Sequence, residues 1–244
     1  MGLLERIEAL SGRPVEFKPD GSLTLRATLQ LARNGAPAHV LRYRPSNEPL
    51  DYWVAYQAGY LLRLMELPPN ERFDFAATGT ASDHVEELLS TGLPPGGGNR
   101  STLVQFGQMT AHWALMNLRS YAIGIRIDQW LADEHPALRA LQTAGMDSLQ
   151  EENVQLLSKR MGKMSIPVPL LGPVAAYALF ADRLLGKTAY AIPYRAAGVL
   201  DLGAELLDIL GKVPPGAAHD RELVDAWAAA IGMTGWYAWI PCKP

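Results

Sequence analysis

The fold is decided by one stretch in the first third of the chain, Leu50-Asp51-Tyr52-Trp53-Val54-Ala55-Tyr56-Gln57-Ala58-Gly59-Tyr60-Leu61-Leu62-Arg63-Leu64-Met65-Glu66. Pro49 precedes it and Leu67-Pro68-Pro69-Asn70 follows it, and neither of these later prolines can continue a helix. At about 100° per residue, one face of the stretch carries Leu50, Trp53, Val54, Tyr60, Leu61 and Leu64, with Asp51 and Glu66 opposite. We therefore predict an amphipathic helix over Leu50 to Glu66.

Gln57 falls in the middle of the apolar face of this predicted helix. A buried side-chain amide without hydrogen-bond partners costs roughly 1–3 kcal/mol. Gln57 is therefore expected to anchor a polar network or to line a cavity.

Toward the N-terminus, turn-forming residues separate segments in which apolar and polar residues alternate. We predict a short helix over Met1 to Leu10, then strands over Pro14 to Lys18, Leu23 to Ala32 and Ala38 to Tyr43, with turns at Pro19-Asp20-Gly21 and Asn34-Gly35. These strands are expected to form a small antiparallel sheet that packs on the Leu50 to Glu66 helix.

Toward the C-terminus, Ser82 caps a short helix that ends at Leu89, and the glycine- and proline-rich segment Gly92 to Gly98 predicts a linker. Helices are expected over Ser101 to Leu118, Arg126 to Leu131, Pro136 to Arg160, Ala175 to Leu185, Ala196 to Leu210 and His219 to Ile231. The predicted class is α+β and mainly helical, with an α+β region over residues 1–95 and an all-helical region over 96–244 that can pack as one continuous body with the first.

The segment from Ala38-His39-Val40-Leu41-Arg42-Tyr43 to Trp53-Val54-Ala55-Tyr56-Gln57-Ala58-Gly59-Tyr60-Leu61-Leu62 resembles the edge strand and metal-binding helix of zincin-type metallopeptidases. Their helix commonly reads V-A-H-E-x-G-H-L-L. Two histidines at i and i+4 hold zinc there, and the glutamate acts as general base. In this sequence Tyr56 and Tyr60 stand at the ligand positions and Gln57 stands at the position of the base.

This resemblance implies a zincin-like scaffold whose zinc chemistry is lost. A neutral tyrosine, with a pKa near 10, is a poor zinc ligand, and an amide cannot take a proton from water. The resemblance also places a further ligand on a later helix, where Glu86 or Glu87 would be left without the histidine pair. We therefore predict no catalytic residues, no metal and no cofactor. An ordinary amphipathic helix, with its tyrosines at the core edge, is the alternative explanation.

Other polar residues support a second hypothesis, a hydrolase that uses dispersed side chains. His84, Glu86, Glu87 and His112 are its candidates, and a metal held by His39, His84 and Glu87 is a variant of the same idea. Against it, no two of the five histidines lie three or four residues apart. His112 also shares a helical stripe with Gln105, Gln108, Met109 and Met116, which faces either solvent or a polar pocket shared with Gln57 and the tyrosines.

The C-terminal segment concentrates aromatic residues, among them Trp236, Tyr237 and Trp239, after Gly235. Such a segment either packs on its own core or anchors a partner. A helical interaction module that assembles through this tail, as a homo-oligomer or with another protein, is the third hypothesis.

Composition narrows the class of partner and the location. The formal net charge is −3 without a run of like charges, which argues against nucleic acid. The single cysteine, Cys242, excludes an intrachain disulfide, and the first residues do not form a signal peptide. Three prolines interrupt the apolar stretch from Ile166 to Ala181, which argues against a membrane span. We expect a soluble, cytoplasmic protein that binds a peptide, a protein or a small molecule.

Overall fold

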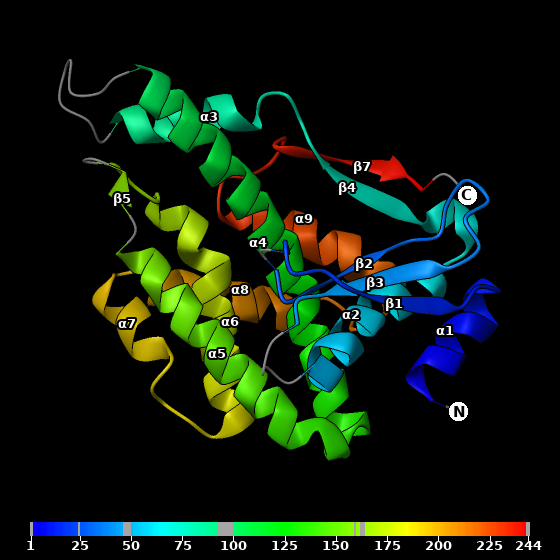
Figure 1. Cartoon of the computed structure of the whole chain (residues 1–244). Helices are drawn as coiled ribbons and strands as arrows, with labels where there is room; N and C mark the ends of the chain where they lie inside the picture. Colours follow the sequence, from blue (N-terminus) through cyan, green and yellow to red (C-terminus); the bar gives the residue numbers. More distant parts are fainter. Residues whose placement is uncertain are drawn as a thin grey trace.

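The computed structural model of the chain describes residues 2–23, 25–45, 50–91, 100–158, 160–161 and 164–242 (Figure 1). The α-helices are α1 (Leu3–Ser11), α2 (Leu50–Met65), α3 (Ala81–Thr91), α4 (Arg100–Glu134), α5 (Arg139–Leu157), α6 (Gly172–Leu185), α7 (Ala191–Ala196), α8 (Leu200–Lys212) and α9 (Asp220–Ala230). The strands are β1 (Val15–Pro19), β2 (Ala27–Gln30), β3 (His39–Tyr43), β4 (Phe73–Ala77), β5 (Arg160–Met161), β6 (Met164–Ser165) and β7 (Tyr237–Pro241). The prediction of a mainly helical α+β protein is confirmed.

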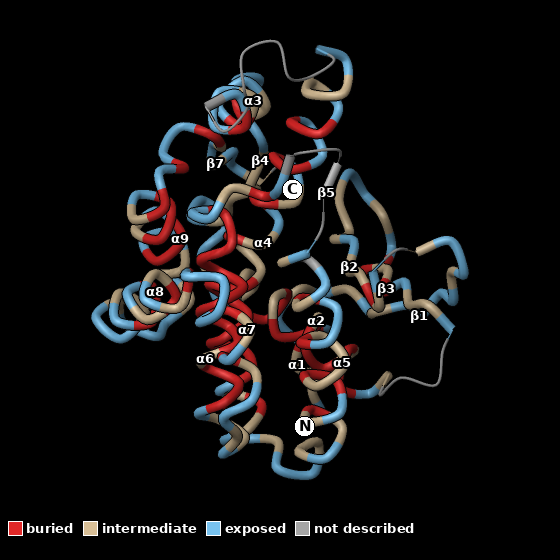
Figure 2. Tube along the Cα trace, turned by 90° about the vertical axis from the view of Figure 1, so that its left-hand side faces the viewer, coloured by how far each residue is buried: buried red, intermediate tan, exposed pale blue. Residues whose placement is uncertain are grey.

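Helix α4 runs through the middle of the molecule and packs against α2, α3, α6 and α9 (Figure 1). Figure 2 shows long buried stretches along α4 and α6. The sequence predicted two separate helical segments here, over Ser101 to Leu118 and Arg126 to Leu131. Between them lie Tyr121, the β-branched Ile123 and Ile125, and Gly124, which are weak helix formers. The structure joins them into one helix of 35 residues. Burial of the 121–125 face against neighbouring helices overrides the low helix propensity.

Helices α2 and α4 approach closely at two glycines. A Cβ on Gly59 would lie 2.6 Å from Cγ2 of Ile127, and a Cβ on Gly124 would clash with the hydroxyl oxygen of Tyr56. The missing side chains therefore allow the Tyr56 ring to fill the space between the two helices.

A buried carboxylate joins four helices in the core. Asp128 of α4 is fully buried and accepts hydrogen bonds from Tyr52 of α2 at 2.8 Å, from Tyr177 of α6 at 2.8 Å and from Gln142 of α5 at 3.0 Å. Each of the two carboxylate oxygens thus has a donor. The network satisfies a charge that would otherwise be costly to bury.

The N-terminal sheet corrects the predicted antiparallel arrangement. Its strand order is β1-β3-β2, with β1 parallel to β3 and β2 antiparallel to β3, so the sheet is mixed. The turn predicted at 19–21 does not bring β1 and β2 together as a hairpin. Instead β3 lies between β1 and β2 and pairs with both of them. The predicted strand over 23–32 is correspondingly reduced to Ala27–Gln30.

The C-terminal half is not wholly helical as predicted, because β7 pairs in antiparallel register with β4 from the first third of the chain (Figure 1). A short β5–β6 pair adds to this departure. The reason is that Phe75, Tyr237 and Trp239 stack together across the β4–β7 ribbon. The predicted linker and the boundary at 95/96 lie outside the described residues.

One stretch, Val168–Leu185, is long and apolar enough to cross a membrane. Because 67% of this window is buried inside the fold, it matches the core helix of a soluble protein. A cytoplasmic location stays a prediction.

Candidate functional site: an arginine and aromatic pocket beside Tyr60

Tyr56 and Tyr60 of α2 point together toward α4. Their ring centroids lie 5.5 Å apart in an edge-to-face arrangement, and both hydroxyls face the main-chain carbonyl of Ser120. Tyr60 donates to this oxygen at 2.6 Å, and Tyr56 lies at 3.5 Å from it. A Cβ on Gly124 would lie 3.2 Å from the Tyr60 hydroxyl oxygen as well as clashing with that of Tyr56. Positions 56, 60 and 124 therefore converge on one point.

The environment of these tyrosines keeps both of them neutral. Burial raises the pKa of Tyr60 to about 12 and raises that of Tyr56 well above its ordinary value. A phenol in this state can donate a hydrogen bond but cannot offer the anionic oxygen that a metal ion prefers.

Gln57 has found the partner that the sequence required. Its Nε2 donates to the carbonyl oxygen of Ala27 in β2 at 3.3 Å. The side chain thus ties α2 to the edge strand of the mixed sheet. Gln57 thus points toward β2, whereas Tyr56 and Tyr60 point toward α4.

The remaining pocket candidates lie elsewhere. His84 stacks on Trp236 with the ring planes 4° apart, and Glu86 packs against Gly107 of α4. Gly107 and Gly124 are separated by about 25 Å along the helix axis, and His112 is about 18 Å from Gly124 by the same measure. Glu87 and His112 are exposed, as are the neighbours of His112 in its stripe, Gln105, Gln108, Met109 and Met116. Among the described residues, no three His, Cys, Asp or Glu side chains are grouped so that they could hold a metal ion.

The aromatic residues of the tail contact their own chain. Trp236 is buried, and the Tyr237 hydroxyl and the Trp239 indole both donate to Oδ1 of Asp225, at 2.6 and 2.8 Å. Trp239 thereby lies against α9 and forms one wall of a pocket.

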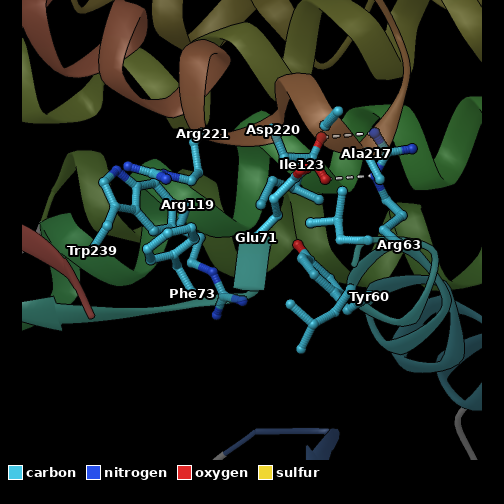
Figure 3. Close-up of a pocket in the computed structure, with 13 residues that line it drawn as sticks. Tyr60, Arg63, Glu71, Phe73, Arg119, Ile123, Ala217, Asp220, Arg221 and Trp239 are labelled. Carbon is cyan, nitrogen blue, oxygen red and sulfur yellow. Dashed lines mark hydrogen bonds and ion pairs between the residues drawn. The ribbon is translucent and has the colours of Figure 1, made fainter. Parts of the chain in front are cut away.

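That pocket has a volume of about 140 Å³ and lies between α2, α4, α9, β4 and β7 (Figure 3). It is lined by Tyr60, Arg63, Leu64, Leu67, Glu71, Phe73, Arg119, Ile123, Ala217, Ala218, Asp220, Arg221 and Trp239. Of the predicted candidates it therefore includes Tyr60 and Trp239, and it joins the tyrosine pair to the C-terminal ribbon.

Two of the three lining arginines form no ion pair with a carboxylate of the described residues. Arg221 lies with its guanidinium carbon 4.0 Å from the centroid of the Phe73 ring and 5.5 Å from that of Trp239. Arg119 lies 5.9 Å from the Tyr60 centroid, and its Nε is buried without a hydrogen-bond partner. Within the part of the chain that the structure describes, neither guanidinium forms an ion pair or a hydrogen bond.

The third arginine belongs to a structural network at the opposite end of the pocket (Figure 3). Arg63 donates to both oxygens of Asp220 at 2.7 Å, and Arg126 reaches the same carboxylate at 3.2 Å. Asp220 is therefore shared by two cations. The pocket lining holds three arginines and only two acidic residues, Glu71 and Asp220, so its net charge is positive.

Comparison of the chain with protein-family models, curated proteins and solved structures gives no match.

Sequence reasoning missed Arg119, Arg221 and Phe73. Arg119 carried one signal, because it is a charged residue in a mostly apolar stretch, Ala114 to Ile127. Arg221 and Phe73 carried none, since a basic residue near a helix start and an aromatic residue in a short segment are common on protein surfaces.

Proposed function

We propose that this chain is a non-catalytic binding protein on a zincin-like scaffold, and that the pocket beside Tyr60 receives its ligand. The observation that carries the proposal is the convergence of positions 56 and 60 of α2 on position 124 of α4. A zinc site needs at least three side chains that meet in this way. Here the three positions hold two neutral tyrosines and a glycine.

The bonding of these residues supports a structural role in place of a chemical one. The tyrosine hydroxyls face the Ser120 carbonyl, and Gln57 is hydrogen-bonded to Ala27. Each group is therefore engaged in holding α2 against its neighbours. The resemblance implied Glu86 or Glu87 of α3 as a further ligand. We propose position 124 for that place, because α4 is the helix that faces Tyr56 and Tyr60.

The pocket supports a binding function because it combines enclosure, aromatic walls and unpaired donors. Its ligand would contact Tyr60 directly, at the edge of the former metal position. The proposal includes a soluble, cytoplasmic protein, in line with the single cysteine and the buried apolar helix.

Metal analysis of the purified protein, combined with a peptidase assay before and after chelation, tests the proposal. We expect less than stoichiometric zinc, no peptide hydrolysis above background, and an unchanged melting temperature after treatment with a chelator. One zinc per chain, or hydrolysis that a chelator abolishes, would overturn it.

A further inference from the structure

The pocket beside Tyr60 presents two guanidinium groups whose hydrogen-bonding edges are unused. The face of Arg221 is covered by Phe73 and Trp239, at 4.0 and 5.5 Å from the ring centroids. Stacking fixes the plane of a guanidinium and leaves its N–H donors directed outward in that plane. Arg221 is therefore oriented before any ligand arrives.

Arg119 adds a stronger constraint, because its Nε lies in the protein interior without an acceptor. A buried donor without an acceptor is costly, and a charged donor more so. The two carboxylates that line the pocket do not pair with it, since Asp220 is bonded to Arg63 and Arg126, and Glu71 forms no ion pair within the described segments. Asp74 interacts with Arg119 only through longer-range charge attraction and is itself paired with Arg33. Nε has almost no accessible surface, so a ligand would instead bond to the terminal Nη groups of Arg119, which form no hydrogen bond within the described residues.

Figure 3 shows Arg119 and Arg221 on the same side of the pocket as Phe73 and Trp239, with Tyr60, Arg63 and Asp220 on the other side. The arginines without an ion-pair partner are thus gathered at one end, while Arg63 at the other end shares the Asp220 carboxylate with Arg126. A cavity of about 140 Å³ is large enough for a single ring or a group of similar size.

We infer that this pocket binds the oxyanion of a small ligand, a carboxylate or a phosphate, between Arg119 and Arg221. Planar guanidinium groups bind both kinds of oxyanion through paired hydrogen bonds. Tyr60 and the Phe73 and Trp239 edges enclose the rest of the ligand. The inference rests on the proposed function in that it names the ligand of the proposed binding pocket.

Titration of the full-length protein with two probes, sodium benzoate and inorganic phosphate, tests the inference by calorimetry and by tryptophan fluorescence. We expect saturable binding of at least one probe at one site per chain, with Trp239 reporting it. Benzamide, which has the shape of benzoate without its charge, is the control ligand. Preference for benzoate would identify a carboxylate ligand, and preference for phosphate a phosphate ligand.

Three variants locate the site. Arg119→Gln/Arg221→Gln is expected to weaken binding by at least about tenfold, because two charge-assisted contacts are lost. Arg195→Gln removes one positive charge from an exposed position on α7 and is expected to leave binding unchanged. Arg221→Lys keeps the charge without the fork and is expected to give an intermediate loss, which separates recognition from misfolding of the double variant.

Absence of saturable binding of both probes would overturn the inference, as would binding that survives in Arg119→Gln/Arg221→Gln or binding of benzamide equal to that of benzoate. Stoichiometric zinc in the same preparation would instead overturn the proposed function. The two failures are therefore distinguishable.

Discussion

The hydroxyl of Tyr60 on α2 donates a 2.6 Å hydrogen bond to the main-chain carbonyl of Ser120 on α4. On the zincin-like scaffold that we propose, the side chain at this position would correspond to a metal ligand. Here it connects two helices directly. The hydrogen bond from Tyr60 to Ser120 therefore contributes to the stability of the fold, and its removal is measurable as a change in the free energy of unfolding.

Tyr60→Phe removes this hydrogen bond and keeps the ring. We expect the free energy of unfolding to fall by about 1 kcal/mol, the typical net contribution of an intramolecular hydrogen bond, with the Ser120 carbonyl left with one donor fewer. Urea unfolding of both proteins measures the difference. Tyr43→Phe, in which no hydroxyl bond is lost, is the control, and equal effects of the two changes would contradict the assignment.

Gly124→Ala tests the convergence of α2 and α4. Although alanine favours a helix, its Cβ would clash with the Tyr56 hydroxyl, so we expect a loss of about 1–3 kcal/mol in the free energy of unfolding. The loss should be partly relieved in a Tyr56→Phe background, which removes the clashing hydroxyl and leaves the 3.1 Å approach to Cζ of the ring, and a double-mutant cycle measures the relief. Gly211→Ala on α8, where an added Cβ meets no atom within 4 Å, should be neutral or stabilising. An equal or higher free energy of unfolding for Gly124→Ala than for the wild-type protein would contradict the close approach of α2 and α4 at Gly124.

Asp128 gives the core a pH dependence. Burial raises the pKa of this carboxyl from 3.8 to about 6, against the lowering effect of its hydrogen bonds to Gln142, Tyr52 and Tyr177. Between about pH 4 and 6 the folded protein therefore binds this proton more tightly than the unfolded chain, and the contribution of Asp128 to stability falls as the pH rises.

Relative to Asp128→Asn, the free energy of unfolding of the wild-type protein should fall by about 3 kcal/mol from pH 4 to above pH 6. Urea unfolding of both proteins across this range isolates Asp128 from carboxyls such as Asp74, whose pKa is lowered by Arg33. A difference that is flat, or that rises with pH, would show that the three donors outweigh burial.

Asp225 holds the C-terminal strand through Tyr237 and Trp239. Asp225→Ala should speed hydrogen exchange of the paired amides of β7 and β4 by roughly thirtyfold, since the two lost bonds to a charged acceptor together contribute about 2 kcal/mol. Exchange in α6 should not change. Asp208→Ala removes an equal charge from exposed α8, and an identical change in β7 exchange for this variant would indicate a general electrostatic effect.

Features set by local chemistry could be predicted from the sequence. The helix over Leu50–Met65 follows from its apolar face and from the prolines that close it, and the need of Gln57 for a partner follows from its place on that face. The neutral state of Tyr56 and Tyr60 follows from the residue type, and burial only reinforces it.

Features set by contacts between distant segments could not be predicted from the sequence. The parallel pairing of β1 with β3 and the pairing of β4 with β7 depend on which strand inserts between which, and periodicity within one strand is silent on that. The pocket is a stronger example, because Tyr60, Arg119, Arg221 and Trp239 come from four separate elements. No spacing in the sequence relates them.

The zinc affinity of a reconstructed triad tests the scaffold most directly. Tyr56→His/Tyr60→His/Gly124→Asp places two imidazoles and a carboxylate at the three converging positions, with the space for the aspartate provided by removal of the Tyr56 hydroxyl. The measurement is zinc stoichiometry and affinity by competition with a chromogenic chelator, with Tyr56→His/Tyr60→His as the matched control. We expect one zinc per folded chain, bound more tightly than by the control. A folded triple variant that binds zinc no better than the wild-type protein would contradict it.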